Sequence, residues 1–238
     1  MERKITSVLS AVRFQNHIAM SKFLFAFLLI SECSCGQQIK KPEVNHAAIA
    51  LNDSAMDLIM CCGADENYRK AATLLDSATT IDSNYFLGYA NKLICLGRLK
   101  EFKKAIVSVK NMMRIRPVAP DLYATCGFLY ESTGDSASAG ENFKKALILD
   151  EGLLDTMSIK NRDYDMLCYN KAVAVIMTGD QAKGNKLLKA LYDRQTDNDY
   201  REMIGSMMNK SKRELVDFMI KGSSNSVSGE VSPNISPD

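Results

Sequence analysis

The chain has 238 residues, of which 46% are hydrophobic and 24% charged. This composition supplies enough apolar material for a core and disfavours a chain that is disordered throughout. Lys and Arg number 30 against 28 for Asp and Glu, and 26 of each sign remain after residues 1–34. Because this balance gives no strong positive field, nucleic acid is not an expected partner and charge alone does not favour an anionic membrane.

An export signal is predicted near the start of the chain. Met20-Ser21-Lys22 precedes an apolar run at 23–30, and a polar, cysteine-containing segment follows. The run has eight residues, too few to cross the ~30 Å hydrocarbon core of a bilayer as a helix. We therefore expect residues 1–34 to be an upstream segment and signal peptide, with Met20 as an alternative start.

This layout resembles the signal of bacterial lipoproteins, in which a peptidase cuts before a cysteine that then receives lipid. Cys35 follows the small Ser34, as that family requires, although Glu32 stands where Leu is usual. Cys33 is the alternative, but Glu32 then occupies a place that needs a small residue. The resemblance implies a lipid on Cys35 and a location in the bacterial cell envelope, on the periplasmic side of a membrane or at the cell surface. Secretion without lipid is the other interpretation.

Residues 35–46 are polar and contain Pro42, which predicts a flexible tether. Beyond the tether, small and apolar residues recur every 34 residues, with Ala71, Ala105 and Ala139 in one series and Ile81, Ile115 and Leu149 in another. A fixed period of this length indicates stacked copies of a helical hairpin, because a single copy cannot bury its apolar side alone.

The pattern predicts four helical hairpins over residues 47–195. The first two pair helices 50–62 with 67–80 and helices 85–96 with 101–115, with Gly97 in the second turn. The third and fourth turns are expected at Gly134-Asp135 and Gly179-Asp180. These turns are 45 residues apart, so eleven additional residues form a longer helix or a surface loop near 152–163.

Two further helices are expected at 196–221, where they would cap the last hairpin. Ser211 and Glu214 have the spacing of a capping box at the start of the second of these helices. Residues 222–238 are rich in Ser, Gly, Pro and Asn, which predicts a disordered tail.

The third hairpin carries, in order, Tyr123, Gly127, Tyr130, Gly134-Asp135, Ala139, Phe143, Ala146 and Asp150. This order resembles the tetratricopeptide repeat (TPR). The resemblance implies an all-α fold: a right-handed α-α superhelix, or solenoid, of about four helical hairpins with C-terminal capping helices. Its small residues let helices approach closely, and its aromatic residues fill the spaces between hairpins.

In that family, ligands lie in a concave groove lined by the first helix of each hairpin. By register, the resemblance places eight residues near such a groove: Met56, Met60, Asn91, Ile94, Phe128, Tyr169, Asn170 and Val173. An apolar groove with two amides suits an extended segment or a partner helix with Leu or aromatic anchors. The alternative role for each residue is packing between hairpins.

No catalytic set is expected, because the chain has only two histidines, His17 and His46, and no phosphate-loop or nucleophile-elbow pattern. Five cysteines follow the leader: Cys61, Cys62, Cys95, Cys126 and Cys168. Without a CxxC element or metal-ligand spacing, we expect them to pack as small apolar residues, with no metal or cofactor. A redox or metal role is the alternative, since free thiols are unusual in an oxidising compartment.

The sequence thus predicts a binding protein without enzymatic activity. It would be an exported, lipid-anchored scaffold that holds another protein or peptide segment near a bacterial membrane. A rival interpretation is a periplasmic accessory module of an enzyme or transport complex with a cysteine-dependent role. A structural assembly component that uses its convex or end surface is a third.

Overall fold

The computed structural model describes residues 44–62, 64–161 and 163–221. Every regular element within these ranges is a helix: α2 (His46–Cys62), α3 (Asp65–Ile81), α4 (Phe86–Arg98), α5 (Phe102–Ile115), α6 (Pro120–Ser132), α7 (Ser136–Thr156), α8 (Tyr164–Met177), α9 (Gln181–Arg194), α10 (Asn198–Met207) and α11 (Lys212–Lys221). The prediction of an all-α chain is confirmed for the described ranges. The predicted signal peptide, Cys35, most of the tether and the C-terminal tail lie outside them.

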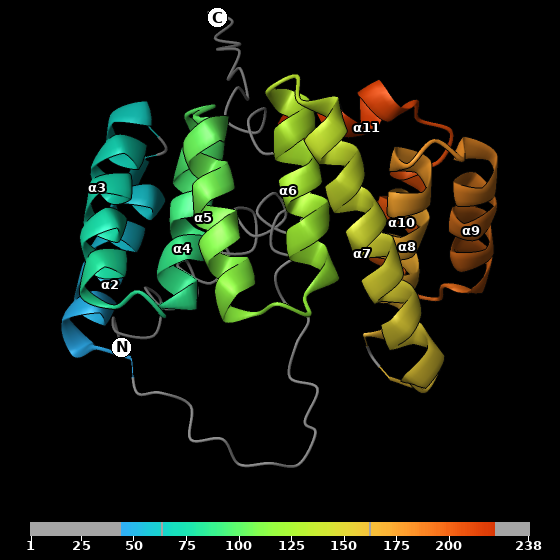
Figure 1. The fold of residues 1–238 in the computed structure, drawn as a ribbon, viewed down its shortest axis with the longest axis horizontal. Helices are drawn as coiled ribbons and strands as arrows, with labels where there is room; N and C mark the ends of the chain where they lie inside the picture. Colours follow the sequence, from blue (N-terminus) through green and yellow to red (C-terminus); the bar gives the residue numbers. More distant parts are fainter. Residues whose placement is uncertain (1–43, 63, 162, 222–238) are drawn as a thin grey trace, which may run out of the picture.

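The helices form antiparallel pairs that follow one another along the long axis of the molecule (Figure 1). The pairs are α2 with α3, α4 with α5, α6 with α7, and α8 with α9, and the second helix of each pair packs against the first helix of the next. We call α2, α4, α6 and α8 the first helices. Each hairpin therefore contributes one first helix and one second helix to a continuous stack.

The turns inside the second, third and fourth pairs share one backbone geometry. Each contains a residue with a left-handed backbone: Lys100 (φ 57°), Gly134 (φ 82°) and Gly179 (φ 111°). In each turn, the backbone amide of this residue and that of the residue after it donate hydrogen bonds of 2.8–3.1 Å to carbonyls in the last turn of the first helix. The backbone thus repeats at the 34- and 45-residue intervals found in the sequence. Gly97, predicted to lie in the turn, is instead inside α4.

The aspartate after each turn glycine caps the second helix. Asp135 Oδ1 accepts a hydrogen bond from the Ser138 amide, and Asp180 Oδ1 accepts one from the Lys183 amide, each at 3.0 Å. A side-chain oxygen at this position satisfies an amide that the helix leaves without a partner. The Gly-Asp pair therefore ends one helix and begins the next.

Small residues let the two helices of a hairpin approach closely. The repeated Ala71, Ala105 and Ala139 are fully buried. A Cβ added to Gly127 would lie 2.8 Å from the Phe143 ring, which packs edge-to-face on Phe128 with centroids 5.0 Å apart. The alternation of small and aromatic residues therefore reflects shape, as the repeat pattern predicts.

The additional residues between the third and fourth turns lengthen a helix and a loop. α7 has 21 residues, whereas α5 and α9 have 14 each. Three more residues lie in the connection from α7 to α8, and one lies in α8. Both expected forms of the insertion are present.

The two C-terminal helices pack in different places. α10 packs on α9, as expected for an end cap, but α11 turns back and packs on α6 (Figure 1). The predicted capping box at the start of α11 is confirmed, because Ser211 N donates to Glu214 Oε2 at 2.8 Å and Glu214 N donates to Ser211 Oγ at 3.3 Å. The expectation that both helices cap the last hairpin therefore fits α10 alone.

Candidate binding site

The eight residues predicted to line a groove fall into two groups. Met56, Met60 and Ile94, on α2 and α4, reach solvent, and Met60 is 58% exposed. The other five are between 1% and 3% exposed: Asn91, Phe128, Tyr169, Asn170 and Val173. For these five residues, the burial fits the alternative role of packing inside the protein.

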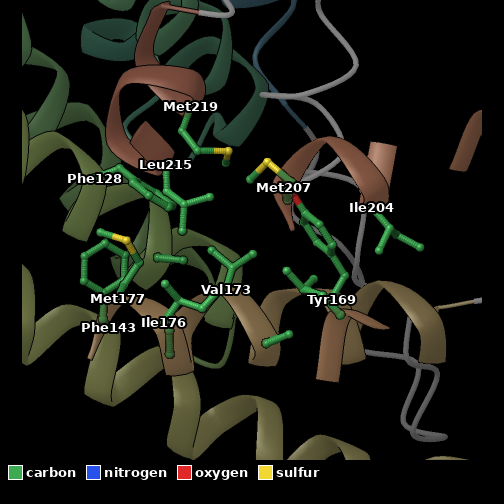
Figure 2. Packing of buried hydrophobic residues seen from close by; sticks show 14 of the residues in the cluster. Phe128, Phe143, Tyr169, Val173, Ile176, Met177, Ile204, Met207, Leu215 and Met219 are labelled. Carbon is green, nitrogen blue, oxygen red and sulfur yellow. The ribbon is translucent and has the colours of Figure 1, made fainter. Parts of the chain in front are cut away.

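The buried residues of α6 and α8 are covered by the chain itself. Phe128, Tyr169 and Val173 belong to one apolar cluster with Ile204 and Met207 of α10 and Leu215 and Met219 of α11. Figure 2 shows these side chains meeting where the four helices come together. Packing an apolar side chain such as Leu contributes about 1.5–3 kcal/mol by removing it from water. α10 and α11 thus cover the part of the first helices that sequence reasoning assigned to a partner.

Polar contacts fix α11 in this position. Lys212 Nζ lies 2.6 Å from Glu131 Oε1 of α6. Two hydrogen bonds join the loop before α11 to α9. Gln181 Nε2 donates to the Lys210 carbonyl at 3.1 Å, and the backbone amide of Asn209 donates to Asn185 Oδ1 at 2.9 Å. The position of α11 is therefore specified by charge and hydrogen bonds as well as by apolar packing.

One of the two predicted amides is used inside the protein. Asn91 Nδ2 donates to Asn52 Oδ1 at 2.7 Å, and both side chains are buried. This bond joins α2 to α4. Asn52 was not singled out from the sequence, although a polar residue on the apolar side of a predicted helix is a signal that could have identified it.

Two acids near the contact between α6 and α7 are buried, which the sequence analysis did not predict. Asp121 is 4% exposed and Asp150 1% exposed. Asp121 Oδ1 and both carboxylate oxygens of Asp150 have no hydrogen-bond partner within the described part of the chain. Burial raises the pKa of Asp121 to about 7. Burial, and then the charge of Asp121, raises the pKa of Asp150 to about 8, against the opposing effect of Lys171.

The described cysteines do not form a common site. Cys95 and Cys126 are fully buried, and burial raises the pKa of their thiols to about 12 and about 11. Both therefore stay protonated and poorly nucleophilic at neutral pH. Cys61 is exposed and Cys168 is partly buried. Among the described residues, no three His, Cys, Asp or Glu side chains gather as metal ligands.

A scan against protein-family models and a search of curated proteins found no match to this chain. The resemblance to the TPR family thus rests on residue spacing and on the turn geometry that recurs at that spacing. Among the described helices, none is both long enough and apolar enough to cross a membrane.

Proposed function

We propose that this chain is a right-handed TPR-type superhelix that binds another protein or peptide segment along its first helices. The single observation that supports this most is the packing of α11. This short helix has Leu215 buried and lies on α6, where a groove-binding segment would lie. The first helices thus already hold one amphipathic helix, and helix-in-groove binding uses the same contacts.

The part of this surface that remains accessible is on α2 and α4. Met56, Met60 and Ile94 lie there at least partly exposed. Methionine side chains adapt to varied apolar surfaces, which suits a site that accepts a segment with Leu or aromatic anchors. We therefore place partner binding at the N-terminal first helices, next to the surface that α11 covers.

We further propose that the protein is exported and held at a bacterial membrane by lipid on Cys35. The support is the arrangement of the leader: a basic residue, a short apolar run and a small residue before the cysteine. Incorporation of labelled palmitate into the wild-type chain, and its loss in Cys35→Ser but not in Cys33→Ser, is the expected result. If incorporation persists in Cys35→Ser, the lipid is not on Cys35. Loss in Cys33→Ser would then assign it to Cys33, and persistence in both variants would exclude both cysteines.

Site-specific photo-crosslinking in the native cell tests the binding proposal. A crosslinker at Met60 or Ile94 should capture the same partner, and Met60→Asp should remove that partner from the purified protein. Val107 is the matched control, because it is 57% exposed but lies on the second helix α5. Capture from Val107 and not from Met60 would place binding on the second helices and contradict the proposal.

A further inference from the structure

The connections between successive hairpins all lie along one edge of the molecule. They are the segments after α3, α5 and α7, and Figure 1 shows them on the same side as the start of α2. The backbone amide of Asn45, just before α2, donates to Asp82 Oδ2 at 3.1 Å, and Asp82 lies in the first of these connections. We call this side, with residues 81–87, 115–120 and 157–161, the linking edge.

The linking edge exposes large aliphatic side chains: Ile81 (47%), Leu87 (45%), Val118 (61%) and Ile159 (68%). On the opposite edge, the turns at 99–101, 133–135 and 178–180 expose none of comparable size, although Met60, near the end of α2, is 58% exposed. Connections exposed to water are usually polar. Exposed aliphatic residues at three successive connections therefore favour contact with an apolar surface outside the chain.

Aromatic and basic side chains accompany these aliphatic residues. Phe86, Tyr123 and Tyr164 lie in the first turn of α4, α6 and α8, and each is partly exposed. Arg116 stacks on the Phe86 ring at 3.9 Å, and the Tyr123 hydroxyl donates to the Pro117 carbonyl at 3.3 Å. Aliphatic residues flanked by rings and cations match the interfacial region of a bilayer, where rings lie at headgroup level and basic side chains reach the phosphates.

The acidic groups of the edge are mostly engaged within the protein. Asp82 accepts hydrogen bonds from the backbone amides of Asn45 and Asn84. Asp165 Oδ1 lies 2.6 Å from Arg194 Nη2. Asp155 remains exposed near Ile159. Any affinity of this surface for a partner would therefore come from its apolar residues and not from its net charge.

We propose that the linking edge contacts the surface of a lipid bilayer. The aliphatic residues belong to three separate connections, and Figure 1 shows these connections spaced along the long axis of the molecule. Such a row fits a broad, flat apolar layer better than the concentrated centre of a protein interface.

The start of α2 adds a second reason. Nine residues separate Cys35 from Asn45, and they reach at most about 30 Å when extended. A lipid on Cys35 would hold the linking edge towards the membrane. This orientation rests on the proposed anchor, whereas the contact of the aliphatic residues with lipid does not.

Photo-crosslinking to lipid tests this contact. The purified full-length protein is reconstituted into vesicles of phosphatidylethanolamine and phosphatidylglycerol, with a crosslinking residue at Leu87, and lipid adducts are measured by mass spectrometry. Val118→Asp with Ile159→Asp should lower the adduct yield at Leu87 at least about fivefold, because carboxylates are expelled from the apolar layer. The matched control, Val107→Asp with Ile148→Asp, removes two similarly exposed apolar residues (57% and 63%) on the second helices α5 and α7 and should leave the yield unchanged.

Three results overturn the proposal: no lipid adduct at Leu87, an adduct yield that the Val118→Asp and Ile159→Asp pair does not change, or an equal loss in the control. Protein adducts at Leu87 in place of lipid adducts would assign the edge to a protein interface. Palmitate labelling of the same samples reports the anchor separately, so a missing lipid anchor and a missing edge contact are distinguishable.

Discussion

The N-terminal and C-terminal first helices share a repeat but present different surfaces. On α2 and α4, Met56, Met60 and Ile94 are accessible. On α6 and α8, the residues of the same pattern lie beneath α10 and α11. Register within a repeat therefore identifies which residues face the same side of the stack, but it does not indicate whether another helix covers that side.

Buried polar groups differ between the two regions in the same way. In the N-terminal region, the amides of Asn52 and Asn91 bond to each other. In the C-terminal region, Asp121 and Asp150 are buried carboxyl groups with raised pKa values. Among the described residues, the buried groups whose charge changes near neutral pH, Asp121 and Asp150, therefore lie in the C-terminal region.

Truncating one apolar residue in each region gives the largest expected contrast. Phe128→Ala should lower the free energy of unfolding by about 3–5 kcal/mol, because it leaves a cavity in a packed cluster. Ile94→Ala, at a partly exposed position, should cost about 1 kcal/mol or less. Urea denaturation followed by circular dichroism measures both. Equal costs at the two positions would mean that α10 and α11 do not cover Phe128.

The pH dependence of stability provides the next contrast. The folded chain holds the protons of Asp121 and Asp150 more tightly than the unfolded chain, whose aspartate pKa is near 3.8. Their contribution to stability is therefore complete below about pH 4 and is lost as pH rises through about 7 to 8. At about 1.4 kcal/mol per pKa unit, these shifts correspond to about 4–6 kcal/mol for each group.

Asp150→Asn isolates this effect, because an amide of the same size carries no proton to lose. Its unfolding free energy should vary less between pH 5 and pH 8 than that of the wild type, by urea titration at each pH. Asn91→Ala, in the N-terminal region, should leave the pH profile of the wild type unchanged. A wild-type stability that rises steadily from pH 5 to pH 8 would show that these carboxyl groups are ionised in the folded state.

A substitution in α11 tests the cover over α6. Leu215→Ala should weaken the packing of this helix by about 2–3 kcal/mol, because the side chain is fully buried. Trypsin should then cleave faster after Lys210 and Arg213, while cleavage within α2 to α5 stays slow. Val107→Ala is the control, since it truncates an apolar side chain that is 57% exposed on α5. Cleavage at the wild-type rate in Leu215→Ala would mean that the residue does not hold α11 in place.

The ion pair between Lys212 and Glu131 should have the smallest effect. Lys212 is 42% exposed in this pair, so solvent screens much of the attraction. Lys212→Met should change the unfolding free energy by about 1 kcal/mol or less. The same trypsin assay should show a small increase in cleavage that high salt reproduces in the wild type. A loss as large as that of Leu215→Ala would make charge, and not apolar packing, the main contact of α11.

Much of the local structure could be predicted from the sequence. The helices, the Gly-Asp turns and the Ser211–Glu214 capping box depend on residues close together in the chain. Lys100 could not be predicted at a left-handed position, because its side chain disfavours that backbone and only the repeat geometry imposes it. Local signals therefore gave the units of the fold but not every turn.

The candidate site was less predictable, because its exposure depends on contacts between distant segments. The apolar residues of α11 match any apolar surface, so their sequence does not specify α6 as the neighbour. The repeat pattern located Asp150 on the third hairpin but did not indicate that it and Asp121 are buried, because burial depends on how the helices pack. The repeat register placed Phe128 and Val173 correctly on first helices, but it could not indicate that another helix covers them.

Hydrogen exchange on the full chain shows whether α11 covers the C-terminal first helices. Amides in α11 should exchange slowly, with protection close to that of α6, and Leu215→Ala should remove this protection without changing that of α3 or α5. If α11 in the wild-type protein exchanges at the rate of an unfolded peptide, it does not cover α6, and Phe128 and Val173 lie open to a partner.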